Sequence, residues 1–79
     1  MPEFARLEEL EREVHDLRIA LQTRIVIEQA KGVLAERTGT TPAEAFRDLR
    51  RYARNSGTTL ASVARAVIEG TLETARVRT

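Results

Sequence analysis

Residues 38–44 read TGTTPAE, and this stretch decides the fold because it ends one helix and begins another. Gly39 readily adopts the left-handed backbone conformation in which many helices stop. Thr41 can cap the next helix with its hydroxyl, Pro42 suits the first helical position, and Glu44 lies three residues after the cap. The stretch therefore predicts two helices joined by a short loop.

Two further helical patterns follow this loop. The first begins at Pro42 and is expected to stop at Asn55-Ser56-Gly57, and its apolar face consists of Pro42, Ala45, Phe46, Leu49 and Ala53. The second is capped by Thr58 or Thr59, and its apolar face consists of Leu60, Val63, Ala64, Val67, Ile68 and Leu72. Gly70 and the polar residues 74–79 predict a frayed end. No segment alternates as a strand does, so the predicted fold class is all-α.

A heptad repeat precedes the loop. Apolar residues spaced alternately three and four apart occupy the a and d positions of this repeat: Leu7, Leu10, Val14, Leu17 and Leu21. Charged residues fill most of the intervening positions. So narrow a stripe favours a coiled coil. The coil would span residues 1–22 and dimerise with a second copy of the chain. The alternative is an amphipathic helix that packs on its own domain.

The heptad repeat ends near Thr23, but the helical pattern continues without interruption. The apolar stripe resumes on a different face as Ile27, Ala30, Val33 and Leu34. This shift predicts one continuous helix whose first half meets a partner chain and whose second half meets the domain's own core. Gly32 lies inside this helix, where glycine costs about 1 kcal/mol relative to alanine. It indicates either close approach by another backbone or ligand, or a tolerated weak position.

Length and composition limit the classes of protein that need be considered. Seventy-nine residues form one domain at most, with a core so small that oligomerisation is the expected supplement. The chain lacks cysteine, a run of about 18 apolar residues and a secretory signal, which fits a cytoplasmic protein without a membrane span. Residues 1–21 hold three arginines against six acidic residues, whereas residues 22–79 hold ten basic residues against six acidic ones. This asymmetry suggests that the C-terminal part meets an anion.

Catalytic patterns are missing from the sequence. The single histidine, His15, falls among the charged residues of the heptad segment and is expected to be solvated. No cluster has metal-ligand spacing, no hydroxyl residue has an obvious base, and no glycine-rich phosphate loop occurs. We therefore expect a protein that is not an enzyme and that needs neither a metal nor another cofactor.

The clearest functional pattern is a stripe of arginines on the helix that begins at Pro42. Arg47, Arg50, Arg51 and Arg54 recur at i, i+3, i+4 and i+7, so they share one helix face. Four neighbouring guanidinium groups repel one another unless an anion or carboxylates complement them. A nucleic-acid phosphate would serve, but so would intramolecular pairs with the neighbouring Glu44 and Asp48.

Other residues extend this candidate anion-binding surface. Arg24 and Lys31 on the long helix and Arg65 on the third helix supply further cations, and the helix start at Thr58 and Thr59 offers unpaired N–H groups to a phosphate.

Three segments, taken in order, resemble the ANTAR domain family. They are Thr23-Arg24-Ile25 with Ala30-Lys31-Gly32, then Glu44-Ala45-Phe46 with Leu49-Arg50, and then Val63-Ala64 with Val67-Ile68, over about residues 21–70. The resemblance implies a three-helix RNA-binding antitermination domain, here residues 23–73. It also implies a dimer that binds small RNA hairpins in nascent transcripts and prevents a terminator from forming.

The resemblance also implies a coil like that of residues 3–22, and a sensor or receiver that regulates the domain. The chain departs from the family pattern at Ala35, where methionine is common, so contacts made by that methionine are in doubt.

Two other functions remain open on the sequence. A helix-turn-helix DNA-binding module would fit the last two helices and their short connection. A protein-interaction adaptor would use only the coil, with the arginine stripe serving as soluble surface.

Overall fold

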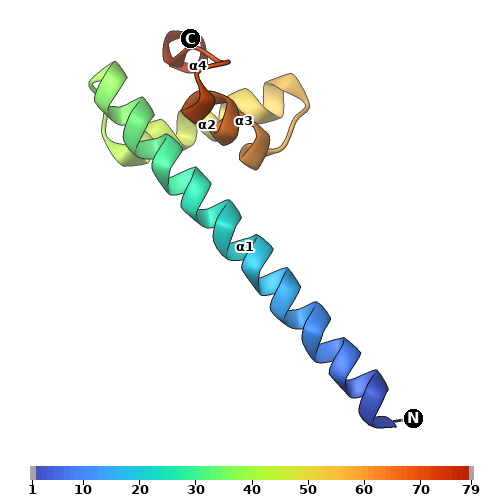
Figure 1. Ribbon diagram of the computed structural model, residues 1–79. Coiled ribbons are helices and arrows are strands. Elements are labelled where there is room, and N and C mark those ends of the chain that lie inside the picture. Colours follow the sequence, from blue (N-terminus) through green and yellow to red (C-terminus); the bar gives the residue numbers. More distant parts are fainter. Residues whose placement is uncertain (1, 79) are drawn as a thin grey trace.

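The computed structural model describes residues 2–78 and consists of helices joined by short loops (Figure 1). Helix α1 spans Pro2–Thr38, α2 spans Pro42–Ser56, α3 spans Leu60–Glu69 and α4 spans Thr74–Arg78. No strand occurs in this described part of the chain. The predicted all-α fold, with one continuous helix that runs from the N-terminal segment into the domain, is therefore confirmed, and the coiled coil itself stays a prediction.

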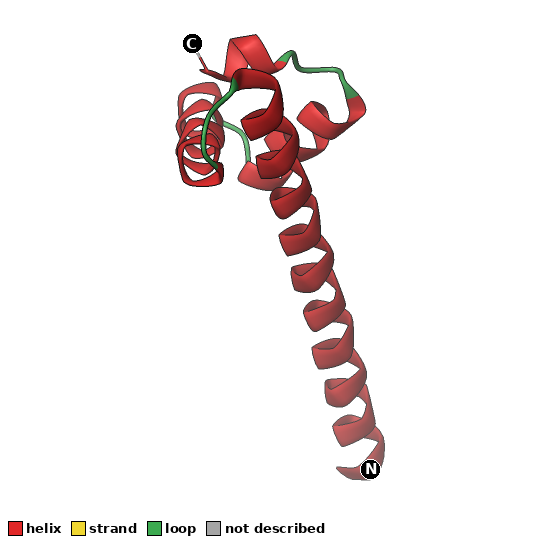
Figure 2. Cartoon of the chain, turned by 90° about the vertical axis from the view of Figure 1, so that its left-hand side faces the viewer, coloured by secondary structure: helices red, strands yellow, loops and turns green. Residues whose placement is uncertain are grey.

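Helix α1 runs far beyond the rest of the molecule, as both Figure 1 and Figure 2 show. Its 37 residues correspond to a length of about 55 Å at 1.5 Å per residue. The longest dimension of the molecule is 56 Å, so this helix alone sets it. Residues 2–22 are all exposed, and only the C-terminal half of α1 packs against the other helices.

The loops contain the caps that the sequence predicts. The Thr41 hydroxyl accepts a hydrogen bond from the Glu44 N–H at 3.1 Å, and Glu44 Oε2 accepts one from the Thr41 N–H at 3.1 Å. Gly39 and Gly57 both have left-handed φ angles, of +69° and +67°, at the ends of α1 and α2. Thr59, rather than Thr58, caps α3 by accepting the Ser62 N–H at 3.1 Å.

The core lies where α2 and α3 pack against the C-terminal half of α1. Its fully buried side chains come from every helix: Ala30, Leu34, Ala45, Leu49, Ala64, Val67 and Val77. Three of these are alanines, whose small side chains let helix backbones approach closely. The structure thus confirms that the second half of α1 belongs to the domain's own core.

Three apolar residues that the sequence places in the core lie at its edge or outside it. Pro42 is exposed, Ile68 in the last turn of α3 is 40% exposed, and Phe46 is only partly buried. Val77 of α4 contributes to the core instead and is 1% exposed. A contribution from so distant a segment cannot be read from the periodicity of α2 or α3.

The prediction of a frayed end over residues 74–79 is wrong for the described part of that segment. Thr74–Arg78 form α4, which packs beside α2. The Arg51 guanidinium donates hydrogen bonds to the carbonyl oxygens of Val77 at 3.4 Å and Arg78 at 3.0 Å. Burial of Val77 and these hydrogen bonds hold the segment, while Thr79 and Met1 lie outside the described residues.

Gly32 lies on the exposed side of α1. A Cβ atom added there would meet nothing within 4 Å, so no backbone of this chain approaches it. Close approach by a partner chain or a ligand remains a prediction.

Replacing Leu49 with alanine should separate the core from its edge. Leu49→Ala should lower the free energy of unfolding by roughly 2–5 kcal/mol because the side chain is fully buried. Ile68→Ala is the matched control and should cost about 1 kcal/mol or less, since that residue is 40% exposed. Urea denaturation followed by circular dichroism at one fixed protein concentration measures both. Equal losses for the two variants would contradict the described core.

Candidate nucleic-acid interface

A cluster of two cations and one aromatic ring joins α1 to α2. Lys31 of α1 places its Nζ 5.2 Å from the centroid of the Phe46 ring. Arg50, one helical turn after Phe46 on α2, places its Cζ 5.6 Å from the same centroid. The negative face of an aromatic ring attracts cations at such distances. The ring therefore contacts two positive charges, one from each helix.

Lys31 is further oriented by a carboxylate of its own helix. Its Nζ lies 3.2 Å from Glu28 Oε1, and the Lys31 side chain is 21% exposed whereas that of Glu28 is 58% exposed. The ammonium group is thus shared between a mostly exposed carboxylate and a half-buried ring. Such an exposed ion pair contributes little energy and gives way easily to a stronger anion.

The four arginines of α2 line one shallow depression on the surface, as the sequence predicts. The structure nevertheless divides them into two kinds. Arg51 pairs with Asp48 at 3.0 Å and holds the C-terminal end of α4, so its guanidinium has intramolecular partners. Arg47, Arg50 and Arg54 are exposed and make no ion pair within the described residues, and Arg50 also lies over the Phe46 ring.

Asp48 is the carboxylate that complements part of this stripe. It is 7% exposed and also meets Arg78 of α4, whose Nη1 lies 3.4 Å from Asp48 Oδ2. The alternative that carboxylates of the same chain pair with the arginines is therefore correct for Arg51. Glu44, the other carboxylate considered, serves in the Thr41 cap, and no ion pair with Arg47 is found among the described residues.

The remaining residues that the sequence predicts to contact RNA lie outside this cluster. Arg24 is exposed on α1 and lies two helical turns before Lys31, so both project to the same side of that helix. Arg65 is exposed on α3. Thr58 and Thr59 form the loop before α3, but both hydroxyls already donate hydrogen bonds, to the Thr59 carbonyl and the Ser62 hydroxyl respectively.

Phe46 is the member of this cluster that the sequence analysis did not place at the surface. Its spacing matches the apolar face of α2, so the pattern assigns it to the core. One signal was available, because Arg50 follows it by four residues and a cation at that spacing can reach the ring. Tyr52, by contrast, packs against the core and lines a separate depression with Thr58, Ser62 and Leu72.

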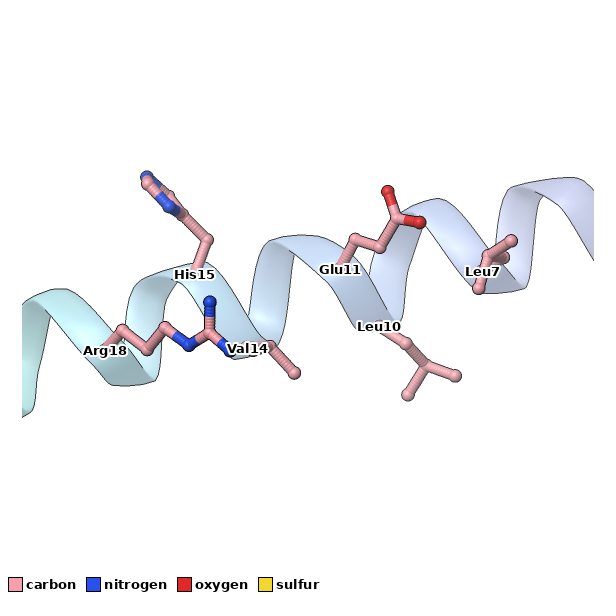
Figure 3. A pocket seen from close by; sticks show the side chains of 6 residues that line it. All are labelled: Leu7, Leu10, Glu11, Val14, His15 and Arg18. Atoms are coloured by element: carbon pink, nitrogen blue, oxygen red, sulfur yellow. The ribbon is translucent and has the colours of Figure 1, made fainter.

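The predicted dimerisation stripe is exposed along the whole coil segment. Leu7, Leu10, Val14, Leu17 and Leu21 are between 47% and 69% exposed. Figure 3 shows the shallow depression bounded by Leu7, Leu10 and Val14 together with Glu11, His15 and Arg18, all from α1. The alternative that this stripe packs on its own domain does not hold in the described structure.

The described residues contain no group of three or more histidine, cysteine or acidic side chains that could hold a metal ion. No buried side-chain polar atom among them lacks a hydrogen-bond partner. None of the described helices has the length and apolar character needed to cross a membrane.

Comparison with known proteins agrees with the resemblance noted in the sequence. A family model described as the ANTAR domain matches residues 15–68. Two relatives, both called transcriptional regulatory protein PdtaR, come from Mycobacterium tuberculosis strains CDC 1551 / Oshkosh and ATCC 25618 / H37Rv. Each is 40% identical over 66 residues, which cover 84% of this chain and 32% of the relative. The chain thus spans about a third of the length of these relatives. No solved structure matches it.

Because only Arg51 has intramolecular partners, replacing Arg51 and replacing Arg47 should change the stability of the domain by different amounts. Arg51→Ala should lower the free energy of unfolding by roughly 1 kcal/mol, because it removes one of the two cationic partners of the buried Asp48 and two hydrogen bonds to α4. Arg47→Ala is the matched control and should change it by less than about 0.5 kcal/mol. Thermal unfolding of both variants measures the difference. A greater loss for Arg47→Ala would refute the assignment.

Proposed function

We propose that this chain, which belongs to the ANTAR domain family, is an RNA-binding transcription antiterminator without enzymatic activity. In this proposal a homodimer binds small RNA hairpins in nascent transcripts and prevents a terminator hairpin from forming. The site of action is the cytoplasm, where transcripts of a bacterial cell are made. The relatives are transcriptional regulatory proteins by name, which supports the general role in transcription.

The observation that carries the proposal is the group of cations without carboxylate partners on α2. Arg47, Arg50 and Arg54 share a face, and among the described residues none of them forms an ion pair. Lys31 adds a fourth positive charge beside Arg50 across the Phe46 ring. Like charges held this close are unfavourable alone, but phosphate groups of RNA relieve the repulsion and release counterions.

Phosphate contacts give affinity but little selectivity, so part of this surface must contact bases. Proteins that select RNA hairpins usually stack on unpaired loop bases and contact their exposed edges. Phe46 is the aromatic ring that lies among the cations, and guanidinium planes stack on bases as well. We therefore assign loop-base contacts to Phe46 and Arg50, and phosphate contacts to Arg47, Arg54 and Lys31.

The exposed stripe of α1 supports the dimer. A monomer would leave Leu7, Leu10, Val14, Leu17 and Leu21 in water, although removal of apolar area from water is worth about 25 cal/mol per Å². A second copy of the chain would cover them in a coiled coil.

Regulation belongs to the proposal as well. The matched relatives are about three times as long as the aligned region, and a sensor or receiver, in the same protein or a separate one, would control the RNA-binding domain.

The adaptor function remains the second candidate because the exposed stripe of α1 would serve it equally well. A DNA-binding module has less support, since the exposed side chains of α3 include a single cation, Arg65, among Ser62, Ile68 and Glu69. RNA binding distinguishes the first two functions, because an adaptor needs no affinity for RNA.

An RNA titration should measure how much the cations contribute to binding. Arg50→Ala should weaken binding of a stem with a small loop, because a loop-base contact is lost. Arg54→Ala should reduce the salt dependence of log K by about one ion, because a phosphate contact is lost. Phe46→Leu should reduce the preference for the looped stem over a perfect duplex of the same stem. Arg12→Ala on the coil is the control and should leave binding unchanged.

Filter binding over a salt series measures these affinities. Equal affinity of the wild type for looped and duplex RNA, or an Arg50→Ala variant that binds like the wild type, would contradict the antiterminator mechanism, and no affinity for either RNA would favour the adaptor function.

The dimer should depend on the apolar stripe. Simultaneous Leu10→Asn and Leu17→Asn replacement should give monomers in analytical ultracentrifugation and a lower melting temperature, since association adds to a small core. Ile19→Asn is the control: Ile19 is also exposed but lies on the opposite side of α1. A wild-type protein that sediments as a monomer at tens of micromolar would refute the dimer.

A further inference from the structure

We propose that α4 is part of the RNA-binding surface, because it holds Arg51 in position to contact a phosphate group of the RNA. This inference rests on the proposed RNA binding. It adds a contact residue, Arg51, and a segment that lies outside the family match, which covers residues 15–68. The position of α4, the atoms of Arg51 that it holds and the charge of the surrounding surface support it.

Helix α4 is docked beside the arginines of α2. It packs against α1 and α2, at the end of the molecule opposite the exposed half of α1 (Figure 1). Val77 is 1% exposed and belongs to the core, so this short helix has a fixed place in the domain. Docking brings the carbonyl groups of Val77 and Arg78 to the guanidinium group of Arg51, which precedes them by 26 and 27 residues.

The contacts of Arg51 use one nitrogen of its guanidinium group. Nη2 lies 3.0 Å from Asp48 Oδ1 and donates hydrogen bonds to the carbonyl oxygens of Val77 at 3.4 Å and Arg78 at 3.0 Å. Asp48 is 7% exposed, and its other oxygen, Oδ2, lies 3.4 Å from Nη1 of Arg78. Three acceptors from two helices therefore fix the guanidinium group, and Arg78 fixes the carboxylate.

The other nitrogens of the Arg51 guanidinium group can still donate to a ligand. No hydrogen bond from Nε or Nη1 is found within the described residues, and the Arg51 side chain is 45% exposed. Arg51 also lines the shallow depression that it shares with Arg47, Arg50 and Arg54. Because the guanidinium group is a rigid plane with five N–H donors, holding Nη2 also fixes the direction of the others. A phosphate in this depression can therefore accept a hydrogen bond from Arg51 while Nη2 stays on α4.

The surface around Arg51 keeps an excess of positive charge. Asp48 supplies one negative charge, but two guanidinium groups contact it, those of Arg51 and Arg78. The exposed Arg47 and Arg54 lie beside them on α2. A carboxylate paired with Arg51 alone would cancel its attraction for an anion, whereas a carboxylate shared with Arg78 orients Arg51 and leaves the surface positive.

Holding Arg51 in advance favours RNA binding. A long side chain that is mobile in the free protein loses conformational entropy when it contacts a ligand, which lowers affinity. The α4 carbonyl groups and Asp48 order the Arg51 side chain during folding, so that RNA does not have to order it. The coupling also works in reverse, because RNA that contacts Arg51 should hold α4 more firmly in place.

Asp48→Asn separates positioning from electrostatics, because it keeps the size of the side chain and removes a negative charge. Positioning predicts that affinity for the looped stem falls by about threefold to tenfold, the factor expected when one long side chain must be ordered on binding. Electrostatics alone predicts tighter binding, since a negative charge near the phosphates is lost. Glu69→Gln, which changes an exposed carboxylate of α3 in the same way, is the control and should have little effect.

Filter binding at a temperature at which circular dichroism shows both variants folded measures these affinities. Tighter or unchanged binding by Asp48→Asn would overturn the positioning role.

Substitutions of Arg51 test its contact with phosphate. Arg51→Lys keeps the charge but lacks the rigid plane that reaches α4 and a phosphate together, so it should weaken binding by a similar factor. Arg51→Ala should also reduce the salt dependence of log K by about one ion. Arg76→Ala, which removes the same charge from the other side of α4, is the control and should leave this dependence unchanged. An Arg51→Ala variant with the salt dependence of the wild type would overturn the contact.

Amide hydrogen exchange of residues 74–78 tests the coupling between RNA and α4. Saturating looped-stem RNA should slow exchange of these amides in the wild type but not in Arg51→Ala, because the coupling acts through the Arg51 guanidinium group. Faster exchange with RNA would mean that phosphate competes with α4 for Arg51, and unchanged exchange would mean that the two contacts are independent. Either result overturns this inference and leaves RNA binding intact. A wild type that does not bind the looped stem would refute the proposed function, and this inference with it.

Discussion

Burial of Ala30 and Leu34 in the core, where α1 packs against α2 and α3, is the constraint on which the rest of the structure depends. Both residues are fully buried, and both belong to a helix that is otherwise largely exposed. Their burial anchors one end of α1 in the domain, and the helix extends from there into solvent. The same contact brings Lys31, the next residue after Ala30, beside Phe46 of α2. Core packing and the position of the cation cluster are therefore set by the same few residues of α1.

The two halves of α1 use different helix faces for different partners. In the C-terminal half the apolar face is covered by α2, α3 and α4, whereas in the N-terminal half the apolar stripe has no cover within the chain. A core of this size is marginal, so covering the stripe with a second chain would stabilise the domain as well as pair it. One continuous helix would in this way connect the proposed dimer contact to the proposed RNA-binding surface.

The four arginines of α2 differ in their partners. Arg51 stabilises the domain by bridging Asp48 and the end of α4, and Arg78 approaches the same carboxylate from α4. Arg47, Arg50 and Arg54 have no carboxylate partner within the described residues and face solvent together. The surface of α2 thus has positive charges without carboxylate partners next to one, Arg51, that is paired with a carboxylate. This uncompensated part, joined to Lys31 through Phe46, is where an anionic ligand would gain most.

The sequence by itself determined α1, α2 and α3, the cap of α2 and the continuity of α1, because these depend on residues close together along the chain. Thr41, Glu44, Gly39 and Gly57 act within one helical turn, and the heptad stripe repeats within one helix. Tertiary structure alone decided the roles of Phe46, Arg51 and Val77. Apolar spacing could not place the Phe46 ring at the edge of the core, since its cation Lys31 comes from another helix. Nor could spacing single out Arg51 among four arginines, because its partners at Val77 and Arg78 lie 26 and 27 residues away, and only folding brings them together.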